Sequence, residues 1–162
     1  MNLPMGPFSD RPDLDELAHL MFRQFSRMEY ALKATGYLKQ PGGNVQADWD
    51  SFAAKIDAEF RVRTDGDPIL KDAVDYLTAQ PPKKQVFEQG GLGWRDVIPT
   101  SATRTGVLLL CVARVRNNLF HGGKFNGNWL DPERSGDLIP RCLVVLDACL
   151  AAAPDVRTAF ES

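Results

Sequence analysis

An arginine and a histidine five residues apart form the pair in this chain best suited to chemistry on an anionic substrate. They are Arg116 and His121, and two asparagines, Asn117 and Asn118, directly follow the arginine. An imidazole exchanges protons near neutral pH, and a planar guanidinium offers paired donors that fit phosphate oxygens. We therefore expect Arg116 to bind a phosphate group and His121 to transfer protons. Asn117 would orient the imidazole or hold a phosphate oxygen.

The sequence around this pair is basic. Residues 97–130 include no Asp or Glu, although the net charge of the chain is −2, and Arg114, Arg116 and Lys124 all lie there. A local excess of positive charge at a helix end attracts an anionic ligand. Arg114, Asn118 and Lys124 are therefore expected to support the site.

These residues follow the most hydrophobic stretch of the chain, residues 106–115. The stretch is too short to cross a bilayer and too continuous for a surface helix, which predicts a buried central helix. Gly122 and Gly123 are expected to end this helix, because glycine readily takes the left-handed conformation of helix ends. His121 would then lie in the last turn, where the helix dipole favours a protonated imidazole. The residues expected to be most buried are Leu108, Leu109, Val112 and Val115.

The pattern Arg116-Asn-Asn-Leu-Phe-His121 at the end of a hydrophobic helix resembles the active-site motif of the HEPN superfamily (higher eukaryotes and prokaryotes nucleotide-binding domains). The resemblance implies a small helical bundle that dimerises and, in many members, cleaves RNA without a metal ion. It also implies a role in a toxin–antitoxin or antiviral defence system, with an antitoxin or defence-system protein as a partner. The expected ligand is RNA, and no cofactor is expected.

Two functions fit these residues. In a metal-independent RNA endonuclease, Arg116 would neutralise the charge that develops as a ribose 2′-OH attacks its own phosphate, and His121 would handle the protons. In a catalytically inactive HEPN-like module that binds a nucleotide or a protein, the same residues would only satisfy carbonyls and pair with acids. Because one chain supplies a single Arg–His set, we expect the nuclease to be a two-fold homodimer whose motifs face each other.

The first long helix is also expected to contribute to the site. Asp13 and Glu16 have the spacing of a capping box, and apolar residues recur at helical spacing from there to about residue 37. Glu29 and Lys33 lie one turn apart on this helix, and the simplest interpretation is an ordinary surface ion pair. Their acidic-then-basic order also resembles the first helix of some HEPN nucleases. That resemblance implies that Glu29 and Lys33 face the Arg–His pair.

Three further helices are predicted from apolar spacing and caps. One starts near Asp48, one follows Asp67 as its cap, and one covers about residues 137–153 with Pro140 in its first turn. The result is an all-α, HEPN-like bundle of about five helices, and the length fits one domain covering residues 1–162.

The connection between residues 80 and 101 is long for a helical protein and contains the run Gly90-Gly-Leu-Gly-Trp94. We expect a flexible loop in which Trp94 packs as an anchor. If RNA were bound nearby, Trp94 or Trp129 would be able to stack on a base.

The cysteines and the overall hydropathy exclude several classes of site. Cys111, Cys142 and Cys149 lie in apolar helical patterns without a C-x-x-C pair, which favours buried free thiols over a disulfide or a zinc site. No His, Cys and Asp cluster has the spacing of metal ligands. The chain shows no signal-peptide pattern and no apolar run of membrane-spanning length, so we expect a cytoplasmic protein with no membrane contact.

Overall fold

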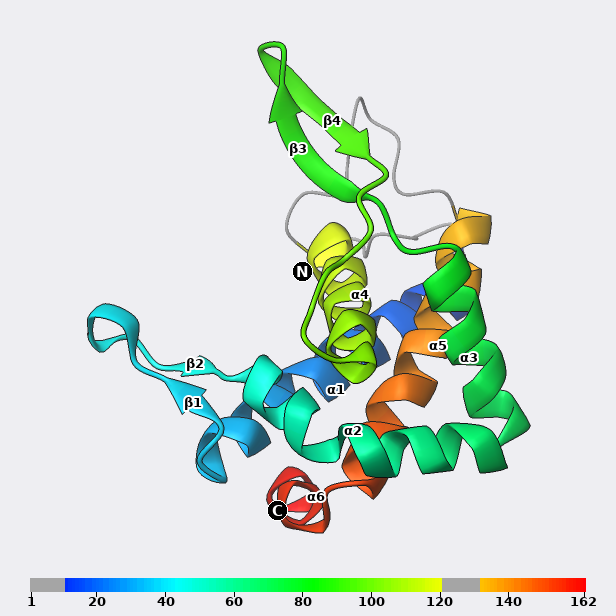
Figure 1. Ribbon diagram of the computed structural model, residues 1–162. Coiled ribbons are helices and arrows are strands. Elements are labelled where there is room, and N and C mark those ends of the chain that lie inside the picture. The colour runs from blue at the N-terminus through cyan, green and yellow to red at the C-terminus, as the bar shows by residue number, and fades with distance from the viewer. Residues whose placement is uncertain (1–10, 121–131) are drawn as a thin grey trace, which may run out of the picture.

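The computed structural model describes residues 11–120 and 132–162, and in these ranges the chain is an all-α helical bundle (Figure 1). Its helices are α1 (Pro12–Ala34), α2 (Trp49–Gly66), α3 (Pro68–Ala79), α4 (Arg104–Phe120), α5 (Pro132–Ala151) and α6 (Pro154–Glu161). Two antiparallel hairpins complete the described part: β1 (Leu38–Lys39) with β2 (Gln46–Ala47), joined through the 3-10 turn η1 (Pro41–Gly43), and β3 (Lys84–Glu88) with β4 (Gly91–Arg95). The predicted fold class is confirmed, with one helix more than expected.

α2 starts where it was predicted, next to Asp48, and α3 starts at its predicted cap, Asp67. The Asp48 carboxylate accepts hydrogen bonds from the Ser51 hydroxyl at 2.8 Å and the Ser51 N–H at 3.1 Å, and these bonds lower the pKa of Asp48. The Asp67 carboxylate accepts from the N–H groups of Ile69 and Leu70, at 2.9 and 3.3 Å. Each carboxylate therefore satisfies amide groups that have no partner inside the helix.

The start of α1 differs from the prediction. The N-cap residue is Arg11, whose side chain makes no capping hydrogen bond. Asp13 accepts hydrogen bonds from the guanidinium of Arg11 at 3.3 and 3.4 Å, so this ion pair takes the place of the predicted capping box with Glu16. Gly36 follows the helix with a φ of 94°, in agreement with a glycine stop.

The last predicted helix, about residues 137–153, corresponds to α5, and a further helix that was not predicted, α6, follows it. α5 begins at Pro132 and not near residue 137, so Pro140 lies inside the helix and not in its first turn. Because Pro140 has no N–H, the carbonyl of Gly136 lacks its usual helical donor. The chain then breaks after α5, and Pro154 occupies the first turn of the separate helix α6.

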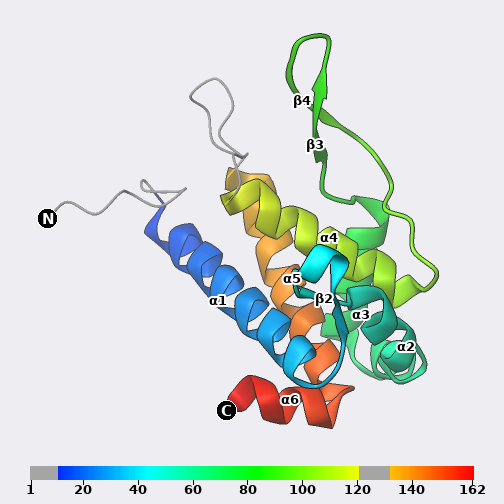
Figure 2. The same ribbon diagram turned by 90° about the vertical axis from the view of Figure 1, so that its left-hand side faces the viewer.

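Helix α6 packs against α1, beneath its carboxyl end in Figure 2. Arg27 of α1 donates a hydrogen bond of 2.5 Å to the carbonyl of Phe160, and its guanidinium lies 4.8 Å from the centre of the Phe160 ring. A cation over an aromatic face adds attraction to the hydrogen bond. These two contacts fasten the C-terminal helix to the bundle.

The connection between α3 and α4 is a β-hairpin and not the flexible loop that we expected. β3 and β4 pair in register from Lys84 opposite Arg95 to Glu88 opposite Gly91. The two turn residues, Gln89 and Gly90, both have positive φ, 50° and 78°. Two positive φ values characterise the type I′ turn, whose twist fits paired strands. The glycine run therefore supplies one turn residue, Gly90, and most of β4.

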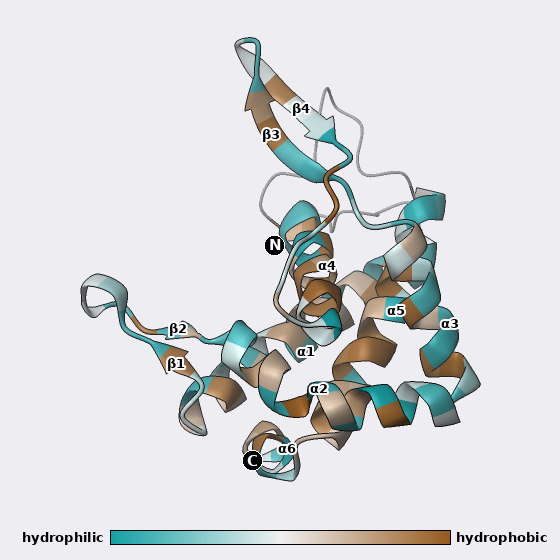
Figure 3. Ribbon diagram, in the orientation of Figure 1, coloured by the Kyte–Doolittle hydropathy of each residue, from teal (hydrophilic) through white to brown (hydrophobic). Residues whose placement is uncertain are grey.

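The four residues of α4 that were predicted to be most buried lie in the hydrophobic core, whereas Leu110 of the same apolar run is 38% exposed. Leu108 and Val112 are fully buried, and Leu109 and Val115 are 4% exposed. The core cluster includes residues from all six helices, and Figure 3 shows the hydrophobic character of α4 and of the neighbouring α5. In the described part of the chain, no helix is long and apolar enough to span a membrane.

The amino end of α4 is fixed by α2 and by the turn before it. The Asp57 carboxylate of α2 accepts hydrogen bonds from the hydroxyl and the N–H of the buried Thr105, at 2.8 and 3.1 Å. The next residue, Gly106, packs so closely that a Cβ there would lie 2.1 Å from Ser101 Oγ and 2.9 Å from Ser101 Cβ. Gly106 is therefore a packing requirement of this turn.

We predict that Gly106→Ala lowers the free energy of unfolding by about 1–3 kcal/mol, because the new methyl group has no room. The matched control is Gly136→Ala in α5, where a Cβ would meet no atom within 4 Å. This control should raise stability by up to about 1 kcal/mol, since alanine favours a helix over glycine. Urea unfolding followed by circular dichroism measures both. Equal stability of the Gly106→Ala protein and the wild type would contradict the close packing.

Candidate functional site

The carboxyl end of α4 carries the arginine half of the predicted site. Arg114, Arg116, Asn117 and Asn118 lie in the last two turns of the helix, whose last residue is Phe120. His121 and Lys124 lie outside the described residues, as do the predicted glycine stop and Trp129.

Arg116 packs against α1. Its guanidinium carbon lies 5.4 Å from the centre of the Phe25 ring, and its Nη1 donates a 3.0 Å hydrogen bond to Asn117 Oδ1. Its Nε is buried, whereas Asn117 is exposed. Ring and amide together fix the plane of the guanidinium, because a cation is drawn to an aromatic face. Asn117 holds this arginine while remaining open to solvent.

Aromatic rings lie beneath this arginine. Phe22 of α1 and Phe120 of α4 have ring centres 4.9 Å apart at an angle of 52°, and Phe25 stacks on Trp49 at 5.0 Å and 24°. Such ring pairs contribute roughly 0.5–1.5 kcal/mol beyond the area that they bury. They fix the carboxyl end of α4 against α1 and the start of α2.

Arg114 and Asn118 face the hairpin. Arg114 donates to the carbonyl oxygens of Pro82, at 3.3 Å, and of Val97, and Asn118 donates to the carbonyl of Lys83 at 2.9 Å. Pro82 and Lys83 precede β3, and Val97 follows β4, so both ends of the hairpin are tied to one helix. In Figure 1 the hairpin projects from the bundle above the end of α4.

The residues of α4 that bond to the hairpin and the residue that packs on α1 lie on different sides of the helix. Arg114 and Asn118 are about one turn apart and share a side of α4, whereas Arg116 is about 200° round the helix from either. The hairpin and α1 therefore flank the end of α4 on different sides. Of the residues predicted to support the site, Arg114 and Asn118 are engaged in structural hydrogen bonds.

Glu29 and Lys33 are half-buried on α1, one and two turns beyond Phe25. Within residues 11–120 and 132–162 they form no ion pair with each other and no hydrogen bond to α4. The expected surface ion pair is thus not formed in the described part of the chain, and no contact there brings either residue to Arg116.

Sequence reasoning missed the aromatic support of Arg116. Phe120 lies one turn after Arg116, inside the motif, and Phe22 and Phe25 lie on adjacent turns of α1. These spacings were visible, but apolar spacing alone does not say which helix faces which. The one signal was that all three are aromatic, since aromatic rings support both core packing and cation contacts.

The cysteines are free and buried, as predicted. Burial raises the pKa of the Cys111 thiol to about 11, against the opposing effect of the Arg114 cation, and burial likewise raises the pKa of Cys142 and Cys149. A thiol must ionise to act as a nucleophile, so these cysteines are inert near neutral pH. In the described ranges no three His, Cys, Asp or Glu residues gather as metal ligands.

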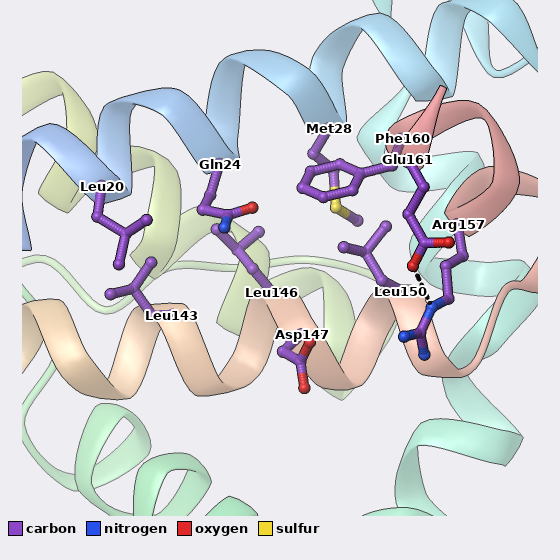
Figure 4. A pocket seen from close by; sticks show the side chains of 10 residues that line it. All are labelled: Leu20, Gln24, Met28, Leu143, Leu146, Asp147, Leu150, Arg157, Phe160 and Glu161. Atoms are coloured by element: carbon purple, nitrogen blue, oxygen red, sulfur yellow. Dashed lines mark hydrogen bonds and ion pairs between the residues drawn. The ribbon is translucent and has the colours of Figure 1, made fainter.

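A groove of about 250 Å³ lies elsewhere, between α1, α5 and α6 (Figure 4). Its lining is mainly aliphatic, and its charged rim includes Asp147 and the ion pair of Arg157 with Glu161, at 2.8 Å. The groove includes none of the predicted site residues. The end of α4 therefore remains the candidate site.

We predict that Asn118→Ala loosens the hairpin and Asn117→Ala does not. Asn118 holds the carbonyl of Lys83, whereas Asn117 is exposed and bonds only within α4 among the described residues. Loss of the tether should cost about 1 kcal/mol, while loss of Asn117 should cost under about 0.5 kcal/mol. Amide hydrogen exchange of β3 and β4 measures the difference. Equal exchange in both variants would show that Asn118 is not a tether.

No protein-family model, no curated protein and no solved structure matches this chain.

Proposed function

We propose that this protein is a metal-independent RNA endonuclease of the HEPN type, with Arg116 and His121 as its catalytic residues. The observation that carries the proposal is the support of Arg116, which lies over the Phe25 ring and is bonded to Asn117 at the end of the helix that leads into His121. A guanidinium held in this way can bind two phosphate oxygens with little further loss of side-chain freedom. Asn117 would add its exposed amide to a phosphate oxygen or to the imidazole.

In the proposed reaction, the 2′-oxygen of a ribose attacks the adjacent phosphorus. A bond forms between O2′ and phosphorus, and the bond between phosphorus and O5′ breaks. The products are a 2′,3′-cyclic phosphate and a 5′-hydroxyl. An imidazole accepts the proton of the 2′-OH, and a second imidazole donates a proton to the departing O5′. Arg116 stabilises the negative charge that builds up on the phosphate oxygens between these events.

The proposal includes a two-fold homodimer. One chain has a single His121, whereas the reaction uses both a base and an acid, and a symmetric interface brings two copies together. The aromatic edge beside Arg116 supports this arrangement, because Phe22 is 43% exposed. Burial of that ring against a second copy would be favourable, since exposed apolar area favours association.

The setting follows from the resemblance alone. We propose a cytoplasmic enzyme of a toxin–antitoxin or antiviral defence system, held in check by an antitoxin or a defence-system partner protein.

Single-stranded RNA should be cut in EDTA, and both His121→Ala and Arg116→Lys should reduce the rate at least about 100-fold. Lysine keeps the charge but loses the paired donors of the guanidinium. A 2′-O-methyl group at the cut position should block the reaction, because the nucleophile is absent. Gel analysis of end-labelled RNA, with cyclic-phosphate detection, measures the outcome. If EDTA stops cleavage, or if His121→Ala cuts as fast as the wild type, the nuclease proposal is wrong. The alternative, a catalytically inactive binding module, then takes its place.

The dimer has its own test. Phe22→Glu should shift the protein from dimer to monomer at micromolar concentration, because it places a charge in the proposed apolar contact. Tyr30→Glu, also exposed on α1 but farther from the end of α4, is the control and should leave the dimer intact. Multi-angle light scattering reports both masses. A wild-type monomer at this concentration would rule out the proposed assembly.

A further inference from the structure

The β3–β4 hairpin has one apolar face and one charged face. Phe87 is opposite Leu92 and Gln85 is opposite Trp94, and alternation along the strands puts these four side chains on one face. Phe87 is 73% exposed and Leu92 is 50% exposed. Both ribbon views show the hairpin standing away from the helices (Figures 1 and 2). This apolar face is therefore open to a ligand.

The other face has a charge arrangement that weakens the isolated hairpin. Lys84 and Arg95 are opposite each other in the register, and like charges in that position repel. Arg95 is compensated by Glu88 at 2.5 Å, but Lys84 has no ion pair in the described part of the chain. Lys83, next to it, is also exposed, and the exposed Asp96 is the acid that follows β4. The base of the hairpin is thus its most basic part.

The basic end of the hairpin is also the end fastened to α4. Asn118 holds the carbonyl of Lys83, and Arg114 holds those of Pro82 and Val97. Arg116 and Asn117 lie between these two tethers in the sequence of the helix. The positively charged end of the hairpin is therefore held beside the candidate site.

We infer that this hairpin, residues 84–95, binds a single-stranded stretch of RNA and presents it to the end of α4. The choice of RNA rests on the proposed function. Phe87 and Trp94 offer ring faces on which bases stack whatever the sequence, and Lys84 with Arg95 offers cations for the phosphates. The two rungs that carry the rings are about 6.8 Å apart along the strands, which gives each ring room for its own base.

Charge favours RNA over a protein partner. An apolar partner surface would explain the exposed rings but not the two opposed cations at the base. An anion placed between Lys84 and Arg95 would turn their repulsion into attraction to a shared phosphate. The rings and the cations lie on opposite faces of the hairpin, so a bound RNA strand would stack its bases on the apolar face and pass its backbone round the base of the hairpin to Lys84 and Arg95.

Binding is measured by fluorescence anisotropy with a labelled single-stranded 2′-O-methyl oligonucleotide, which cannot be cleaved. Phe87→Ser should weaken affinity about tenfold, because one stacking surface is lost. Lys84→Gln should reduce the slope of log affinity against log salt by about 0.7, the value for one phosphate contact on a single strand. Val62→Ser, 67% exposed on α2, is the matched control and should bind like the wild type. Phe87 is exposed, so its replacement should leave the circular dichroism spectrum unchanged.

Three results would overturn the inference. They are no binding by the wild type, equal binding by the Phe87→Ser and Val62→Ser proteins, or loss of self-association in Phe87→Ser with RNA affinity unchanged. The last would assign the face to a second copy of the chain. Because this readout needs no cleavage, weaker binding by Phe87→Ser supports the inference even if the wild type cuts no RNA. Conversely, if His121→Ala abolishes cleavage and the hairpin variants bind RNA like the wild type, the nuclease proposal is supported and RNA binding by the hairpin is rejected.

Discussion

The burial of α4 decides where this protein can place polar chemistry. The middle turns of α4 bury Leu108, Leu109 and Val112, so charged groups fit best near the ends of the helix, since an unpaired charge inside the core is very costly. At the amino end, Asp57 satisfies the buried Thr105. At the carboxyl end, the chain turns polar over Arg114 to Asn118. The hydrophobic run and the candidate site are thus consequences of one arrangement.

The carboxyl end of α4 performs two tasks, and helical geometry keeps them apart. Arg114 and Asn118 donate hydrogen bonds to backbone carbonyls at the base of the hairpin, while Arg116 contacts an aromatic ring of α1, Phe25. The local excess of positive charge in the sequence therefore overstates the charge open to a ligand. Of the two arginines, only Arg116 has the aromatic and amide support that suits a phosphate-binding group.

The sequence predicted those structural features that depend only on residues close together in the chain. The start of α2, the Asp67 cap, the burial of Leu108 and Val112, and the buried thiols follow from residue type and spacing over a few positions. The hairpin was missed because its turn uses Gln89-Gly90, whereas asparagine or aspartate before glycine is the usual signal. α6 was missed because its eight residues are too few to show a helical pattern of apolar positions. Glu29 and Lys33 had the right spacing, but the spacing of an ion pair gains little against the side-chain entropy that a fixed pair costs.

The hairpin shows why the two tasks of α4 depend on each other. A two-stranded hairpin is marginally stable alone in water, and this one bears exposed apolar residues and a pair of opposed cations. Hydrogen bonds that involve a charged donor contribute about 1.5–3 kcal/mol, so Arg114 can supply much of what the hairpin lacks. Arg114 and Asn118 also lie on either side of Arg116 in the chain. The helix end that carries Arg116 over an aromatic ring therefore also holds the β3–β4 hairpin. Any movement of that helix end moves both Arg116 and the hairpin.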